Sequence, residues 1–81
     1  MRTALVTGAA RGIGLATTRK LTDQGYRVAM VDRDGPALRD AAAGSGDAVV
    51  AMEFDISIPE QVEAMAAQFA DAFGACNALV N

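Results

Sequence analysis

The sequence predicts an α/β fold in which helices are wound on both faces of a parallel sheet. Two observations predict it. Short apolar runs alternate with helix-like segments along all 81 residues, in the order strand, helix, strand, helix, strand, helix, strand. Such alternation is typical of parallel strands joined by right-handed crossovers. In addition, the first apolar run leads directly into a glycine-rich turn, and that turn leads into a helix.

The glycine-rich turn contains Gly8, Gly12 and Gly14 and indicates a nucleotide-binding element. A helix that follows a strand so abruptly leaves its first backbone N–H groups unpaired, and these donors and the helix dipole favour a phosphate. A Cβ atom would obstruct the tight turn, an approaching pyrophosphate or the neighbouring strand. The spacing is neither the common G-x-G-x-x-G fingerprint nor a P-loop, which needs a final Gly-Lys-Ser/Thr.

The first strand is expected over residues 2–7 and the first helix over residues 12–24. Gly25 follows, and glycine tolerates the left-handed backbone that commonly ends a helix. The residues that recur at helical spacing are expected to face the sheet. They are Ile13, Ala16, Thr17 and Leu21.

The middle of the chain is expected to add two strands and a short helix. Residues 27–32 form an almost continuous apolar run, which suits a strand covered on both faces of the sheet. Asp34 is placed to cap a helix over residues 36–43, which has proline in its first turn. A glycine-containing turn at residues 44–47 ends this helix, and a third strand is expected over residues 48–54.

A longer helix follows, and its start carries a capping-box pattern. Ser57 and Glu60 have the required spacing, Pro59 lies in the first turn, and Gly74 ends the helix. An apolar stripe along this helix and two residues of the preceding strand are expected to face the core. These residues are Met52, Phe54, Val62, Met65, Ala66, Phe69 and Phe73.

Residues 77–81 are expected to begin a fourth strand. In a doubly wound sheet of order 3-2-1-4-5-6 this strand lies in the middle, whereas here it would be an edge with open backbone groups. We therefore expect residues 1–81 to be the N-terminal part of a larger dinucleotide-binding domain. Cys76, just before this strand, is expected to be a buried or half-buried thiol.

The composition excludes several classes of function. With 52% apolar and 21% charged residues, the chain is globular rather than disordered. A net charge of −3 without runs of like charge gives no electrostatic case for binding nucleic acid or anionic membranes. One cysteine and no histidine leave metal catalysis and histidine base catalysis unsupported. The few apolar residues before Gly8 are too short for a signal peptide or a membrane span, so we expect a cytoplasmic protein.

Asp32 is a candidate cofactor ligand at the end of the second strand. It follows Gly14 by eighteen residues, close to the distance at which dinucleotide-binding folds place an acid on the ribose hydroxyls; a solvated turn aspartate is the alternative. The same carboxylate would repel a 2′-phosphate, which favours NAD over NADP. Arg11 and Arg33 oppose that preference, because guanidinium groups bind phosphate well, unless both are solvated or stack on the adenine.

Three segments together resemble the short-chain dehydrogenases/reductases. The turn Thr7-Gly8-Ala9-Ala10-Arg11-Gly12-Ile13-Gly14 is similar to the family's T-G-x3-G-x-G motif, Asp55-Ile56-Ser57 to its D-[VIL]-[ST] segment, and Leu79-Val80-Asn81 to the start of its L-V-N-N-A-G segment. The resemblance implies a Rossmann-type fold: the glycine turn, braced by its threonine, holds the pyrophosphate, the first acid binds the ribose, and the second accepts from the adenine amino group. The cofactor-binding residues implied are Gly8, Arg11, Gly12, Ile13, Gly14, Asp32, Arg33, Asp55 and Ile56.

The resemblance implies an oxidoreductase that transfers hydride between NAD, or less favourably NADP, and an alcohol or ketone. The family's catalytic serine, asparagine and Y-x-x-x-K motif come later than the matched segments, and Tyr26 lies in no such motif, so no catalytic residue is assigned. The implied partners are a small-molecule substrate and further copies in a homo-oligomer, without nucleic acid or membrane. Two alternatives stay open: a non-catalytic sensor of the dinucleotide and, less favoured by the residues before Gly8, an S-adenosylmethionine-dependent methyltransferase.

Overall fold

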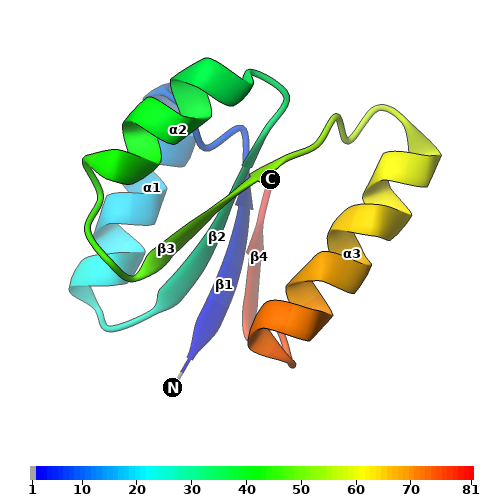
Figure 1. The fold of residues 1–81 in the computed structure, drawn as a ribbon. Helices are drawn as coiled ribbons and strands as arrows, with labels where there is room; N and C mark the ends of the chain where they lie inside the picture. The colour runs from blue at the N-terminus through cyan, green and yellow to red at the C-terminus, as the bar shows by residue number, and fades with distance from the viewer. Residues whose placement is uncertain (1) are drawn as a thin grey trace.

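The structure is a computed structural model and describes residues 2–81. The elements are β1 (Thr3–Thr7), α1 (Gly12–Asp23), β2 (Arg27–Asp32), α2 (Gly35–Ala43), β3 (Val49–Glu53), α3 (Pro59–Phe73) and β4 (Ala78–Val80). Figure 1 shows three layers, in which the sheet lies between α1 and α2 on one side and α3 on the other. None of the described helices is long and apolar enough to cross a bilayer.

The four strands are parallel, and their order across the sheet is β3-β2-β1-β4. This is the beginning of the doubly wound order that the sequence predicts, so the predicted fold class is confirmed. In the register of the two central strands, Thr7 at the end of β1 stands opposite Val31 of β2. Because the carboxyl ends of parallel strands meet at one end of a sheet, the turns that follow β1, β2 and β3 converge there.

The central strands supply two apolar layers, because successive side chains of a strand point to opposite faces. Ala4 and Val6 of β1 pack with Leu38 on the side of α1 and α2. Leu5, between them in the sequence, packs with Met65 and other side chains on the side of α3. The continuous apolar runs of β1 and β2 thus reflect burial on both faces of the sheet.

The end of α1 has the geometry expected from its glycine. Gly25 has a φ of 88°, in the left-handed region. Its N–H donates to the Thr22 carbonyl at 3.0 Å, and the N–H of Tyr26 donates to the Leu21 carbonyl at 3.0 Å. These two bonds form a Schellman motif, which satisfies carbonyls that have no partner within the helix.

The face of α1 that meets the sheet differs from the predicted one. Ile13 is 86% exposed and Ala16 is exposed, whereas Thr18 is fully buried. Thr18 donates through Oγ1 to the Gly14 carbonyl at 2.9 Å. The helix approaches the sheet through Gly14 and Thr18 because small side chains allow a close contact, and this rotates Ile13 away from the core.

The capping box predicted at the start of α3 is wrong. The N-cap residue is Ile58, and it makes no side-chain capping bond. The Ser57 hydroxyl instead donates to Asp55 Oδ1 at 2.6 Å. The cap predicted for α2 is confirmed, since Asp34 Oδ1 accepts from the Ala37 N–H at 3.2 Å.

Three further expectations about burial need correction. Met65 and Phe69 are buried as predicted, but Val62 is 37% exposed and Ala66 is exposed. The stripe of α3 that contacts the sheet is therefore narrower than the sequence suggests. Cys76 is exposed rather than buried or half-buried, because it lies in the turn between α3 and β4.

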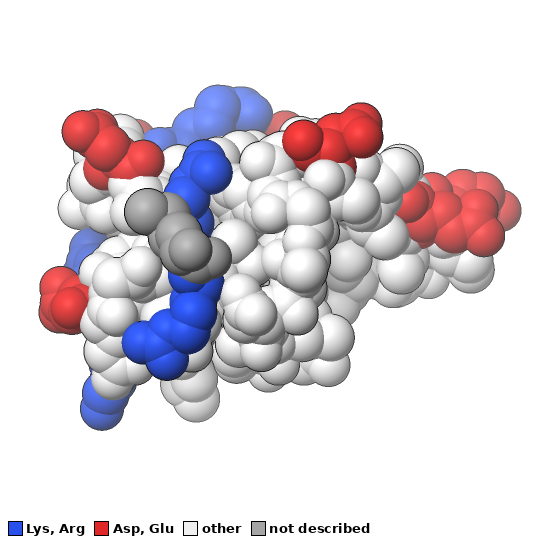
Figure 2. Space-filling model, turned by 90° about the horizontal axis from the view of Figure 1, so that it is seen from below, with Lys and Arg blue, Asp and Glu red and all other residues white. Residues whose placement is uncertain are grey.

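Figure 2 shows the end of the molecule at which the strands begin, where basic side chains form a row. Arg2 lies over the Tyr26 ring at 4.6 Å, and Arg27 lies over the Phe73 ring at 4.6 Å. Both distances fall within the range of cation–π contacts. These arginines cover aromatic rings at the end of the sheet opposite the converging turns.

Candidate functional site

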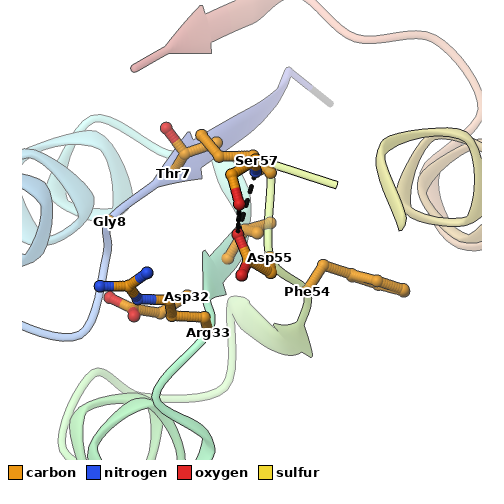
Figure 3. A pocket seen from close by; sticks show the side chains of 9 residues that line it. Thr7, Gly8, Asp32, Arg33, Phe54, Asp55 and Ser57 are labelled. Atoms are coloured by element: carbon orange, nitrogen blue, oxygen red, sulfur yellow. Dashed lines mark hydrogen bonds between the residues drawn. The ribbon is translucent and has the colours of Figure 1, made fainter. Parts of the chain in front are cut away.

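A pocket of about 260 Å³ lies where the turns after β1, β2 and β3 converge (Figure 3). Ligands of open parallel sheets bind at this end of the strands. Five of the nine predicted cofactor-binding residues line the pocket. They are Gly8, Asp32, Arg33, Asp55 and Ile56.

The other four predicted residues form the glycine turn and the first turn of α1, beside the pocket. Gly8 and Gly12 have φ values of 62° and 60°, a left-handed backbone that favours glycine. Gly14 has an ordinary φ, but a Cβ atom there would lie 2.1 Å from the Gly8 carbonyl oxygen. Arg11 is the N-cap of α1 and makes no side-chain capping bond. The first-turn amides of α1, including that of Ile13, therefore point out of the helix without a side-chain acceptor among the described residues.

Asp32 links the end of β2 to the glycine turn. Its Oδ2 accepts from the Ala10 N–H at 3.1 Å, and its Oδ1 accepts from the Asp34 N–H at 3.0 Å. The adjacent Ala9 N–H donates to the Val31 carbonyl at 3.0 Å. Each carboxylate oxygen has a second lone pair, so this half-buried group can brace the turn and still accept from a ligand in the pocket.

Arg11 is paired with Asp34 across the two turns. The Arg11 guanidinium contacts Asp34 Oδ2, and the side chains are 69% and 44% exposed. The hydrogen bond from the Ala37 N–H, and to a smaller extent the bond from the Arg11 guanidinium, hold the pKa of Asp34 below its ordinary value. Arg33, the other arginine of the predicted site, lines the pocket at the end of β2.

Asp55 lies at the opposite side of the pocket from the glycine turn. Its Oδ1 accepts from the Ser57 hydroxyl at 2.6 Å and from the Ser57 N–H at 2.9 Å. The bond from the Ser57 hydroxyl lowers the pKa of Asp55 most, and the bond from the Ser57 N–H lowers it further. The nearby positive charge of Arg33 lowers the pKa by a smaller amount. Gln61 Oε1 accepts from the Asp55 N–H at 2.6 Å. Asp55 is thus an ionised acceptor at neutral pH, held in place by the turn that precedes α3.

Replacing Ser57 by alanine should raise the pKa of Asp55 toward its ordinary value of 3.8, because the hydroxyl is the largest cause of the shift. In the wild type the folded-state pKa is the lower one, so ionised Asp55 stabilises the fold above about pH 3.8, and this contribution is lost as the pH falls through the folded-state value. Carboxyl NMR titration measures the shift. Ser57→Thr keeps a hydroxyl and should titrate like the wild type; identical curves for the alanine variant would contradict the assignment.

Four residues that line the pocket were not predicted as ligands. They are Thr7, Val31, Phe54 and Ser57. Thr7 donates weakly through Oγ1 toward the Val80 carbonyl at 3.4 Å, a bracing contact between β1 and β4. Phe54 is half-buried and packs against the core on the side of α3, as predicted. Its place directly after β3 was the available signal, because residues just beyond parallel strands face the ligand end of a sheet.

The strand order and the glycine turn define the class of doubly wound α/β domains that bind nucleotides at their strand ends. A family model described as short chain dehydrogenase matches residues 2–81. The chain belongs to this family. Membership confirms the resemblance drawn from its motifs and removes the methyltransferase alternative.

The chain is similar to several dehydrogenases over nearly its whole length. It is 38% identical to a sorbitol dehydrogenase from Cereibacter sphaeroides and 41% identical to a 1-deoxy-11-beta-hydroxypentalenate dehydrogenase from Streptomyces exfoliatus. Each match covers 99% of this chain but only 31% and 30% of those proteins. The chain therefore spans less than a third of the length of these relatives.

Solved structures show the same fold. A 3-ketoacyl-(acyl-carrier-protein) reductase from Brucella melitensis, complexed with NADH, superposes with a TM-score of 0.92 at 33% identity, covering 96% of this chain and 32% of that one. A menthone neomenthol reductase from Mentha piperita superposes with a TM-score of 0.90 at 32% identity, covering 99% of this chain and 30% of that one.

Proposed function

We propose that residues 1–81 are the N-terminal, cofactor-binding part of an NAD(P)-dependent oxidoreductase that transfers hydride between nicotinamide and an alcohol or ketone. The observation that carries the proposal is the position of the glycine turn, whose Ala10 N–H donates to Asp32 Oδ2 at 3.1 Å and which leads directly into the first turn of α1. Membership of the short chain dehydrogenase family supports it. So does the similarity to a reductase complexed with NADH.

The pocket fits the adenosine half of a dinucleotide. Its lining includes the apolar residues Val31, Phe54 and Ile56. Asp32 and Asp55 come from neighbouring strand ends and provide acceptors for the ribose and the adenine (Figure 3). A flat base between apolar walls with a few polar groups at its edges is a common arrangement in nucleotide sites.

The glycine turn would hold the pyrophosphate. The amides of Gly12, Ile13 and Gly14 lie at the positive end of the α1 dipole, and Gly8 leaves space for a close approach of the phosphates. The 86% exposed Ile13 side chain lies next to these amides, where it would contact the bound cofactor. When bound, the nicotinamide supplies the group that gains or loses hydride.

NAD is the cofactor that the site favours. Asp32 offers lone pairs to a ribose diol and negative charge against a 2′-phosphate. Arg11, which could offset that charge, is paired with Asp34.

The proposal extends to location and partners. We propose a cytoplasmic homo-oligomer that acts on a small-molecule alcohol or ketone and binds neither nucleic acid nor membranes. The net charge of −3 without a basic run supports the last point. The similarity to a relative named sorbitol dehydrogenase supports an alcohol substrate.

Calorimetric titration with NAD, ADP-ribose and S-adenosylmethionine tests the binding function. NAD and ADP-ribose are expected to bind, because both carry the adenosine and pyrophosphate groups that the site would hold; S-adenosylmethionine is not. Steady formation of reduced nicotinamide by the complete protein, with a panel of polyols and secondary alcohols, tests the reaction. Binding of NAD without turnover on any of them would favour a sensor, and failure of ADP-ribose to bind would contradict the proposed site.

A further inference from the structure

Asp34 connects the two turns that flank the pocket. Its Oδ1 caps α2 by accepting from the Ala37 N–H at 3.2 Å, and its Oδ2 contacts the Arg11 guanidinium. Its own N–H donates to Asp32 Oδ1 at 3.0 Å. Asp34 therefore contacts both Asp32, which we propose as the ribose acceptor, and Arg11 of the glycine turn.

Arg11 is the part of this arrangement that can change partner. It belongs to the glycine turn, next to Ala10, whose N–H binds Asp32 at 3.1 Å. Its side chain is 69% exposed even within the ion pair, so a ligand can reach the guanidinium. Guanidinium groups bind carboxylates and phosphates through the same fork of donors. The Asp34 carboxylate and a ligand phosphate would therefore compete for Arg11.

We propose that Asp34 weakens the binding of dinucleotides that carry a 2′-phosphate by keeping Arg11 paired. The inference rests on the proposed function, because it takes Asp32 as the ribose partner. While the ion pair is intact, a 2′-phosphate beside Asp32 meets the negative charge of that carboxylate, and the Arg11 cation of the glycine turn is already neutralised by Asp34. Asp34 is a positioning residue that acts through Arg11.

The size of the effect follows from exposure. Both side chains of the pair are largely in solvent, at 69% and 44% exposure, so water and salt screen their attraction. Releasing Arg11 should change the NADP dissociation constant by about two- to fivefold. A 2′-phosphate is required for this effect, so the NAD dissociation constant should change by less.

Asp34→Asn provides the test. Asparagine keeps an oxygen that can accept the Ala37 N–H at the start of α2, and it removes the charge that holds Arg11. NAD and NADP are titrated into the wild type, Asp34→Asn, Arg11→Gln and the double variant. NADP binding is expected to tighten about two- to fivefold in Asp34→Asn, and this gain should vanish in the Arg11→Gln background.

Glu53→Gln is the matched control. It also removes one negative charge and breaks an exposed ion pair, that of Glu53 with Arg39 at 3.0 Å, without changing Arg11. An equal gain in NADP affinity in this variant would overturn the proposal in favour of a general charge effect. The same gain in the Arg11→Gln background would overturn it as well.

Three other outcomes would also decide the matter. If Asp34→Asn weakens the binding of NAD and NADP equally and lowers the melting temperature, the proposal is overturned and Asp34 acts only as a helix cap. If Asp34→Asn does not fold, Asp34→Ser takes its place, because serine can also cap a helix. A wild type that binds NAD but whose Asp34→Asn variant gains no NADP affinity overturns this inference alone. A wild type that binds neither dinucleotide overturns the proposed function and this inference with it.

Discussion

Gly14→Ala is expected to weaken NAD binding about tenfold or more and to lower the melting temperature. A Cβ atom at Gly14 would lie 2.1 Å from the Gly8 carbonyl oxygen and 2.7 Å from the Gly8 carbonyl carbon. Both are backbone atoms, so no side chain can move aside, and α1 must shift away from the end of β1. Overpacking of this kind costs about 1–3 kcal/mol. The shift would also carry the first-turn amides of α1 away from the pyrophosphate.

Gly44→Ala is the matched control for this substitution. Gly44 is the C-cap of α2 with a φ of −85°, and the nearest atoms to an added Cβ are 3.8 and 3.9 Å away. Alanine fits there, so neither stability nor NAD binding should fall. Calorimetry gives the two dissociation constants, and thermal unfolding followed by circular dichroism gives the stability. Equal dissociation constants for the two variants would mean that the glycine turn is not the binding element.

Features that depend on neighbouring residues could be predicted from the sequence. The alternation of apolar runs predicted the seven elements, because a strand buried on both faces requires a continuous apolar run. The Asp34 cap and the Gly25 helix end were predictable for a similar reason. A cap bonds an N–H three residues away, and a Schellman motif spans a few residues around one glycine.

Features that depend on packing were not predictable in this way. Periodicity assigned Ile13 and Ala16 to the core, but the face of α1 is set by how closely Gly14 approaches the Gly8 carbonyl. The spacing of Ser57 suggested a helix cap, but the Asp55 carboxylate two residues earlier competes for the same hydroxyl and is the stronger, charged acceptor.

The candidate site shows the same division. Its glycine turn and strand-end acids could be located from local sequence, since spacing alone places them at the ends of β1, β2 and β3. The bonds that organise these residues could not. Asp32 with the Ala10 N–H and Asp34 with Arg11 join positions more than twenty residues apart, which come together only through the parallel crossover of α1.

The Asp32 carboxylate has one structural role and one proposed binding role, and a substitution affects the two differently. It braces the glycine turn through the Ala10 and Asp34 N–H groups, and it faces the pocket as the proposed ribose acceptor. Loss of the brace should weaken both dinucleotides, because it loosens the turn that would hold the pyrophosphate. Loss of the negative charge should favour only the dinucleotide with a 2′-phosphate. The ratio of the two affinities therefore isolates the charge.

Asp32→Ala is expected to weaken NAD binding about tenfold or more, because hydrogen bonds to a charged group contribute about 1.5–3 kcal/mol. NADP should weaken less or tighten, since removing the carboxylate ends its repulsion of the 2′-phosphate and leaves Arg33 able to meet that phosphate. The preference for NAD should thus shrink or invert. Asp32→Asn, which keeps one oxygen, serves as the control and should shift the ratio with a smaller loss of NAD affinity. Titration of both dinucleotides into the three proteins gives the ratios. If the wild type already binds NADP more tightly, the arginines dominate and the assignment of NAD is wrong; if Asp32→Ala leaves the ratio unchanged, the carboxylate does not face the ribose.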